Sequence, residues 1–131
     1  MSRFLTLLRV EHAVDTADGK WILVSPLIYD SDVANHVVIV PEGFQTDFAS
    51  VPRLPLVYLA VGNMAQEAAV VHDYLYNTHQ VSRKMADDMF HEAAQVGGVS
   101  RWQSWMLWAG VRIGGGAYWK EPPVASVEAT Y

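Results

Sequence analysis

The residues best suited to chemistry are the adjacent pair His72 and Asp73, which follow the apolar run 68–71. Helical spacing would place Tyr76 on the same face as His72 and turn Asp73 about 100° away. Two ionisable groups beside an apolar run cost stability unless they are paired or used. An imidazole and a carboxylate in this setting indicate a general base beside a cation-binding group.

A second acidic helix supplies the partner that such a base needs. Asp87 shares a helical face with His91, and the short linker between the two helices makes them antiparallel neighbours. We therefore expect Asp87 to face His72, because a carboxylate on one imidazole nitrogen fixes the tautomer and raises the basicity of the other. Tyr76 is expected to hydrogen-bond the same carboxylate.

Asp73 is then available for a hard cation, with calcium as the candidate. Asp47, in the polar face of the alternating run 44–48, is predicted to be a further ligand or an orienting group. A structural alternative stays open. In that alternative His72 is a core histidine hydrogen-bonded to a neighbour, and Asp73 pairs with Arg53 or Arg83.

Other polar residues receive simpler interpretations. Asp88 and Glu92 are four residues apart on one predicted helix, and we interpret them as its solvated face. His12, His36 and His79 lie in loop-like or strand-end contexts and are not predicted to be ligands. The remaining histidine, on the face of Asp87, is the better candidate.

The elements that must position these residues fall into two halves. β-Branched and aromatic runs separated by turn residues predict strands in the first half, at 21–24, 27–29, 37–40 and 44–48. The continuous β-branched run 37–40 is predicted to be buried on both faces. Residues 3–10 are apolar, and periodicity does not decide between an edge strand and a short helix.

The second half carries helical signals, over about 64–76, 83–96 and 101–113. Ser82 and Ser100 are predicted N-caps, and Gln103 completes a capping box with Ser100. The predicted fold class is α+β, with a small N-terminal antiparallel sheet packed against about three C-terminal α-helices. Residues 1–131 are predicted to form a single domain in which 120–131 is an extended or flexible tail.

Composition excludes several classes of protein. The chain is 51% hydrophobic and 18% charged, as in globular proteins. It has no cysteine, which excludes disulfide scaffolds, thiolate metal sites and cysteine nucleophiles. The net charge of −5 argues against nucleic-acid binding through a general basic field. We expect no signal peptide and no transmembrane helix, which would need about 20 apolar residues.

The third predicted helix carries an aromatic stripe, with Trp102, Trp105 and Trp108 spaced three residues apart. Core packing is the default interpretation of such a stripe. The alternative is an interfacial surface, because tryptophans flanked by Arg101 and Arg112 suit a membrane headgroup region or a protein partner.

Several runs together resemble a family found mainly in tailed bacteriophages and prophages, domain of unknown function 1353 (DUF 1353). These runs are Val40 to Arg53, Ala68 to Tyr76, Ala86-Asp87-x-x-Phe90 and the Trp-rich helix, within roughly residues 21–119. The resemblance brings no established activity. It implies phage origin, hence a location in the host cytoplasm or the virion, and polar family positions at Asp47, His72, Asp73 and Asp87.

A second resemblance is local. His-Asp-x-x-Tyr on one helix, followed by Asp on a second, is similar to the active site of phospholipase A(2) enzymes. It implies that His72 activates water, that Asp73 binds calcium, and that Tyr76 and Asp87 orient the histidine. The chain departs from that pattern because it has no cysteines and no glycine-rich calcium loop before the helix.

Two hypotheses follow. The leading one is a phage-encoded protein with a His-Asp hydrolase-like site, a metal-dependent lipid or ester hydrolase whose catalytic residues are His72, Asp87, Tyr76 and Asp47. The rival is a non-catalytic virion (tail) or assembly component in which these residues form a buried structural network. In either, the Trp-rich helix and the C-terminal tail are the expected contacts with other phage proteins, a second copy or a membrane surface.

Overall fold

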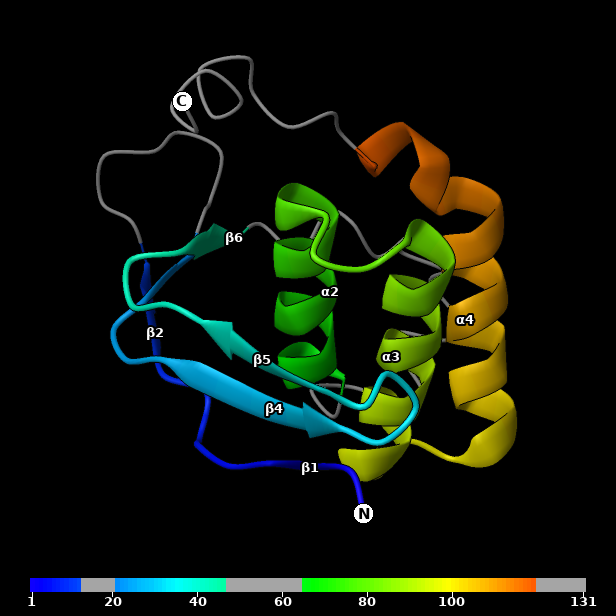
Figure 1. The fold of residues 1–131 in the computed structure, drawn as a ribbon, viewed down its shortest axis with the longest axis horizontal. Coiled ribbons are helices and arrows are strands. Elements are labelled where there is room, and N and C mark those ends of the chain that lie inside the picture. The colour runs from blue at the N-terminus through cyan, green and yellow to red at the C-terminus, as the bar shows by residue number, and fades with distance from the viewer. Residues whose placement is uncertain (13–20, 47–64, 120–131) are drawn as a thin grey trace.

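The computed structural model describes residues 1–12, 21–46 and 65–119. Strands occupy the N-terminal part and helices the C-terminal part (Figure 1), which confirms the α+β class. The strands are β1 Arg3–Phe4, β2 Val10–His12, β3 Trp21–Leu23, β4 Leu27–Ser31, β5 His36–Val40 and β6 Gln45–Thr46. The helices are α2 Gln66–Thr78, α3 Arg83–Val96, α4 Arg101–Gly114 and the 3-10 helix η1 Gly115–Tyr118. None of the described helices has the length and apolar character needed to cross a membrane.

The strands form two antiparallel sheets of three strands each, ordered β1-β4-β5 and β2-β3-β6. The chain passes back and forth between the two sheets. β3 of one sheet leads into β4 of the other, and β5 leads back toward β6 (Figure 1). Residues 3–10, which the sequence left undecided, contain the edge strand β1 and the first residue of β2. Asp47, Arg53 and the tail 120–131 lie outside the described residues.

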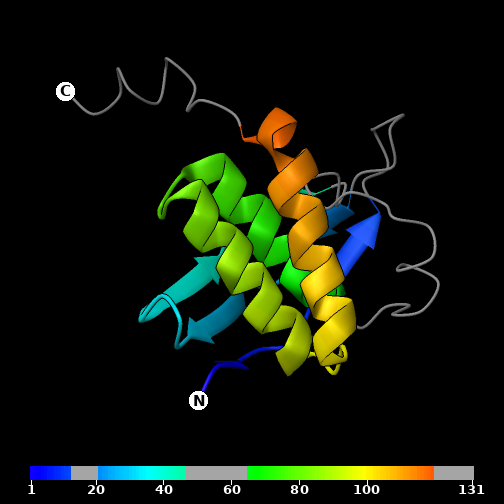
Figure 2. The same ribbon diagram turned by 90° about the vertical axis from the view of Figure 1, so that its right-hand side faces the viewer.

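Strand β5 alternates between a buried and an exposed face. Val38 and Val40 are 0% exposed, whereas Val37 is 47% and Ile39 is 55% exposed. The prediction that this run is buried on both faces is therefore wrong. The helices lie on one side of β4 and β5 only (Figure 2), so the other face of β5 remains in contact with solvent.

The three helices pack in sequence, with α3 between α2 and α4 (Figures 1 and 2). α2 also contacts β4 and β5. It is therefore covered on most sides, as a helix that is apolar nearly all round must be. Its buried residues are Ala68, Ala69, Val70, Val71, His72, Leu75 and Tyr76.

The ends of the helices follow local signals. The Ser82 side chain accepts a hydrogen bond from the Met85 backbone N–H at 3.1 Å, and Ser100 caps α4 in the same way through Gln103. α3 therefore has the predicted bounds. α2 runs two residues beyond the predicted end, to Thr78. The His79 N–H still bonds to the Leu75 carbonyl, and the left-handed backbone of His79 (φ 54°) then turns the chain out of the helix.

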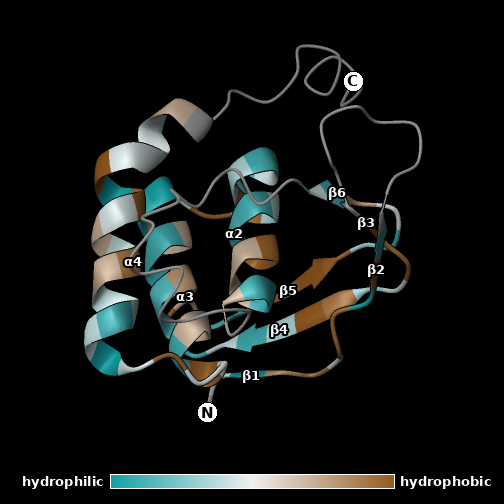
Figure 3. Cartoon of the chain, turned by 180° about the vertical axis from the view of Figure 1, so that it is seen from behind, coloured by the Kyte–Doolittle hydropathy of each residue, from teal (hydrophilic) through white to brown (hydrophobic). Residues whose placement is uncertain are grey.

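The core joins the β1-β4-β5 sheet to all three helices. β5 and the first part of β4 are hydrophobic, whereas the end of β4 is hydrophilic (Figure 3). The inward side chains of these strands meet those of the helices. The largest fully buried side chains include Leu27, Tyr29, Leu75, Met89 and Phe90. Burial of this kind, at roughly 25 cal/mol per Å² of apolar surface, is the main favourable contribution to folding.

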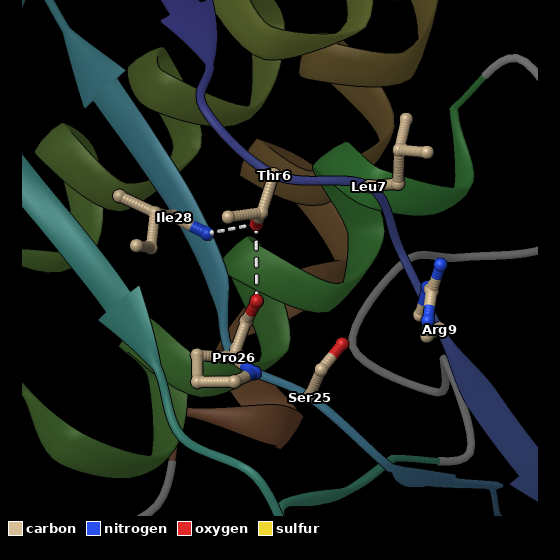
Figure 4. A pocket seen from close by; sticks show the side chains of 6 residues that line it. All are labelled: Thr6, Leu7, Arg9, Ser25, Pro26 and Ile28. Atoms are coloured by element: carbon tan, nitrogen blue, oxygen red, sulfur yellow. Dashed lines mark hydrogen bonds between the residues drawn. The ribbon is translucent and has the colours of Figure 1, made fainter.

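The two sheets separate at Pro26, which has no N–H to offer to a ladder. The Thr6 hydroxyl bridges the break, since it donates to the Pro26 carbonyl at 3.0 Å and accepts from the Ile28 N–H at 3.0 Å (Figure 4). A pocket of about 340 Å³ opens there, lined by Thr6, Leu7, Arg9, Ser25, Pro26 and Ile28. None of the predicted site residues belongs to this lining.

Candidate functional site

His72 and Asp87 meet inside the protein, where α2 packs against α3. Nε2 of His72 lies 2.7 Å from Oδ1 of Asp87, and both side chains are 0% exposed. The short connection between the helices, with the left-handed His79 and the capping Ser82, reverses the chain and sets these two positions at the same level. The two residues are therefore brought together as the helix spacing predicts.

Tyr76 shares the same carboxylate oxygen. Its hydroxyl donates to Oδ1 of Asp87 at 2.6 Å. Because Tyr76 lies one helical turn after His72, the ring of Tyr76 also packs on the imidazole, with ring centroids 4.2 Å apart. Phe90 contacts the imidazole from α3 at 5.0 Å between centroids. Among the described residues, the hydrogen bond to Asp87 and the rings of Tyr76 and Phe90 hold the imidazole in place.

Two arginines complete the cluster, and the sequence reasoning did not identify either role. Nη1 of Arg112 donates to Oδ2 of Asp87 at 2.8 Å. Nε of Arg83 donates to the Tyr76 hydroxyl at 3.2 Å. Arg112 stands in the last turn of its helix, where a cation is favourable for the helix dipole. That signal does not point to a carboxylate on another helix.

Gly115 permits the close approach of η1 to this cluster. A Cβ at this position would lie 2.6 Å from the Tyr76 hydroxyl and 3.4 Å from Nη2 of Arg83. Nη2 of Arg83 also donates to the carbonyls of Val111 at 3.0 Å and Arg112 at 2.8 Å. The C-terminal end of α4 is thereby fixed against Tyr76.

The protonation states follow from burial and from these contacts. Burial lowers the pKa of His72 and outweighs its hydrogen bond to Asp87, which alone would raise the pKa as the sequence indicated. Burial would raise the pKa of Asp87, but the hydrogen bonds from His72, Tyr76 and Arg112 hold it below its ordinary value. Burial and then the bond to Asp87 raise the pKa of Tyr76. Asp87 is therefore ionised and His72 neutral near pH 7.

The tautomer of His72 follows as well. An ionised carboxylate only accepts hydrogen bonds, so Nε2 of His72 carries the proton that points at Asp87. The lone pair of the neutral ring is then on Nδ1. Chemically, the arrangement can orient an imidazole whose Nδ1 accepts a proton.

Asp73 is half-buried on another face of α2, and its Oδ2 accepts a hydrogen bond from the Thr46 hydroxyl at 2.7 Å. Within residues 1–12, 21–46 and 65–119, no group of three or more His, Asp or Glu side chains could hold a metal ion. Calcium takes about 6–8 oxygen ligands. The described residues supply no such cluster around Asp73, and Asp47, predicted to join it, lies outside them, so calcium binding stays a prediction.

Glu92 is not part of a solvated helix face, so that interpretation is wrong. Its carboxylate accepts hydrogen bonds from the Tyr29 hydroxyl at 2.7 Å, the Ser31 hydroxyl at 2.7 Å and the Val33 N–H at 2.9 Å. Burial and then Glu92 raise the pKa of Tyr29. The residue thus fastens the β4–β5 hairpin to α3.

Asp88 is also engaged, because it accepts hydrogen bonds from Nε1 of Trp108 and from Nζ of Lys84, both at 2.8 Å. On the same helix, Nε2 of His91 is buried and has no hydrogen-bond partner among the residues that the structure describes, and burial lowers the pKa of this residue. His91 does not join the cluster around Asp87, although it shares that helical face in projection.

The aromatic stripe of α4 is divided between two environments. Trp102 is 63% and Trp105 is 57% exposed. For these two residues the core interpretation is wrong, because the buried α4 side chains are those of Ser104, Leu107 and Val111. The alternative, an interfacial surface, remains a prediction.

Comparison with known protein families gives a match that covers α2, α3 and most of α4. A family model described as "Protein of unknown function (DUF1353)" matches residues 21–111. The match includes His72, Asp73 and Asp87, and it ends one residue before Arg112. No curated protein and no solved structure matches the chain.

Proposed function

The chain belongs to the DUF1353 family, and we propose that it is a phage-encoded protein with a His-Asp hydrolase-like site that acts on an ester or lipid. The observation that carries the proposal is the 2.7 Å contact between Nε2 of His72 and Oδ1 of Asp87, with Tyr76 on the same oxygen. An imidazole oriented in this way by an ionised carboxylate is the arrangement of a general base.

The proposed reaction uses neutral His72, and it requires the packing around this side chain, which is 0% exposed, to open and admit water. Nδ1 takes a proton from water, and the resulting hydroxide attacks the carbonyl carbon of the ester. The imidazolium then returns the proton to the departing alkoxide, so the products are a carboxylic acid and an alcohol. Asp87 and Tyr76 keep the ring in place, and the Asp87 carboxylate stabilises the imidazolium while it exists.

Calcium is part of the proposal through Asp73, with Asp47 as a second ligand or an orienting group. The reaction above is written without the ion, and calcium binding by Asp73 is tested separately. The Asp73→Asn variant tests the ion directly. If the proposal is right, calcium binding measured by titration calorimetry is lost in Asp73→Asn and present in the parent.

A substitution of His72 tests the enzyme proposal. His72→Asn should lower turnover of phospholipid vesicles or of simple esters by about 10²–10⁴-fold. His36→Asn, a change outside the helix interface, should leave turnover unchanged. Denaturant unfolding of each variant shows whether the fold is intact. The proposal fails if the parent has no turnover on either substrate, or if folded His72→Asn retains it.

A second candidate function comes from another class, a non-catalytic virion, tail or assembly component. The observation that favours it is the complete burial of His72 and Asp87, since buried polar groups in a fully bonded cluster stabilise a unique packing. In this case His72→Asn unfolds the protein at lower denaturant and the parent shows no turnover. A fixed, symmetric copy number in purified particles supports the same candidate.

We also propose that exposed Trp102 and Trp105 dock a protein partner, either another phage protein or a second copy of the chain. Aromatic residues are enriched in the centres of protein interfaces. A membrane surface is the competing occupant, and nucleic acid is not expected for a chain of net charge −5.

A further inference from the structure

The Asp87 carboxylate divides its two oxygens between different partners. Oδ1 accepts from both Nε2 of His72 and the Tyr76 hydroxyl, at 2.7 Å and 2.6 Å. Oδ2 accepts from Nη1 of Arg112 at 2.8 Å. Two donors thus share one oxygen while the cation occupies the other. This crowding needs a cause, because a free carboxylate would offer one oxygen to each neutral donor.

Arg112 provides that cause. Its side chain is 30% exposed whereas Asp87 is 0% exposed, so the guanidinium reaches the buried carboxylate from the edge of the cluster. A charge-assisted hydrogen bond is about twice as strong as a neutral one. It therefore fixes the rotation of the carboxylate and directs Oδ1 toward α2.

The backbone of Arg112 is itself held. Nη2 of Arg83 donates to the carbonyls of Val111 and Arg112, and Nε of Arg83 donates to Tyr76. Arg83 stands at the start of α3 and these carbonyls at the end of α4. The C-terminal turn of α4 is thus tied to the same residues that Arg112 orients.

We propose that Arg112 is a positioning residue of this site, which sets the rotation of Asp87 so that its Oδ1 holds His72 as the Nε2–H tautomer. The catalytic meaning of this inference rests on the proposed function. The tautomer of His72 can be measured without an activity assay, so the proposed function and the role of Arg112 can be refuted independently. If the parent protein has no turnover but His72 carries its proton on Nε2, the hydrolase proposal is refuted and the proposed role of Arg112 is not.

The test is nitrogen-15 and proton NMR of the full chain labelled at histidine, with His72 assigned by the loss of its signals in His72→Gln. The parent should show protonated Nε2 and a slowly exchanging Nε2 proton. In Arg112→Gln that proton should exchange about tenfold faster, the factor expected when a hydrogen bond to a charged group weakens. Arg112→Lys, which keeps the charge, should recover part of the protection.

Arg101→Gln is the matched control, because it removes the same charge from the exposed start of the same helix. Its His72 signals should equal those of the parent. If the chain has turnover, Arg112→Gln should lower kcat about tenfold more than it raises KM, as loss of alignment does. Folded Arg112→Gln with unchanged Nε2 exchange overturns the proposal, and so does a parent with protonated Nδ1.

A second variant covers the case in which Arg112→Gln does not fold. Tyr76→Phe removes the competing donor on Oδ1 and leaves Arg112 on Oδ2. The Nε2–H tautomer of His72 should then persist, because Arg112 alone sets the carboxylate. Loss of the Nε2–H tautomer in folded Tyr76→Phe would show that Tyr76, not Arg112, positions His72 and Asp87.

Discussion

Asp87 illustrates how a fully buried carboxylate stays ionised in this protein. Three donors reach it, one from α2 through His72, one from the same helix through Tyr76, and one from α4 through Arg112. Removing one partner of such a pair is costly because it leaves a buried charge uncompensated. The complete set of bonds is therefore what lets α2, α3 and α4 share an ionised core residue.

Burial of two histidines predicts a loss of stability in mild acid. Burial lowers the folded-state pKa of His72 and His91, whereas unfolded histidines titrate near about 6.5. The unfolded chain then binds more protons below about pH 6.5. The free energy of unfolding has its full value above that pH. It falls as the pH is lowered toward the pKa values of the folded state, by up to about 1.4 kcal/mol per pH unit for each histidine.

Urea unfolding between about pH 7.5 and 5 measures this loss. His72→Gln and His91→Gln should each make the free energy of unfolding less dependent on pH. His36→Gln, outside the helix interface, is the control and should follow the parent. An equally steep dependence in His72→Gln would contradict the assignment of a lowered pKa to that residue.

At the scale of elements, the junction of α4 and η1 depends on one glycine. In Gly115→Ala the new Cβ would meet the Tyr76 hydroxyl at 2.6 Å, so the backbone or Tyr76 must move. Overpacking of this kind costs about 1–3 kcal/mol. Gly116→Ala is the matched control, because the nearest atoms to its Cβ belong to Arg83 at 3.9 Å.

The free energy of unfolding in urea should therefore fall for Gly115→Ala and stay within about 0.5 kcal/mol of the parent for Gly116→Ala. The bond between Tyr76 and Asp87 should also be disturbed only in the first variant. Equal stability of the two variants would mean that η1 moves away from Tyr76 at little cost.

Local signals predicted the elements well, because capping acts within a few residues. Ser82 alone places the start of α3, and Gly97 follows its last residue. The burial of β5 was not predicted because its β-branched run carries no information on how many faces the helices cover. That property belongs to the packed layers, and Val37 and Ile39 report it only once the layers are known.

The candidate site was predictable in part for the same reason. His72, Tyr76 and Asp87 lie on two helices joined by a short turn, so their faces follow from spacing. Arg112 reaches Asp87 from a third helix, and Glu92 binds Tyr29 across 63 positions of the chain. No periodicity along one helix tells which distant element its charged side chain meets, so these partners required the structure.

At the scale of the whole molecule, α4 packs against α3 on the side away from α2 (Figure 2), and among the described helices it is the one with strongly exposed tryptophans. Trp102 and Trp105 are more than half exposed, whereas Trp108 donates to Asp88 and is half-buried. The helix carries two arginines and no acidic residue in a chain of net charge −5. Contiguous exposed apolar patches are typical of interaction surfaces, and the docking role proposed for Trp102 and Trp105 belongs to this class.

The double change Trp102→Gln and Trp105→Gln should therefore separate association from folding. The free energy of unfolding should stay within about 0.5 kcal/mol of the parent, because neither side chain packs in the core. Trp108→Gln should instead lose about 1 kcal/mol with its bond to Asp88. Light scattering of the purified chain measures association with a second copy. If the proposed phage origin holds, incorporation into particles measures docking on other proteins of the phage.

If the surface binds protein, one of these associations is lost in the double variant and kept in Trp108→Gln, while sedimentation with anionic vesicles is unchanged. Loss of vesicle binding alone would assign the same surface to a membrane. Association equal to the parent in every assay would contradict a docking role for α4. It would leave the two tryptophans as solvent-facing residues of a helix whose other side holds Arg112 against Asp87.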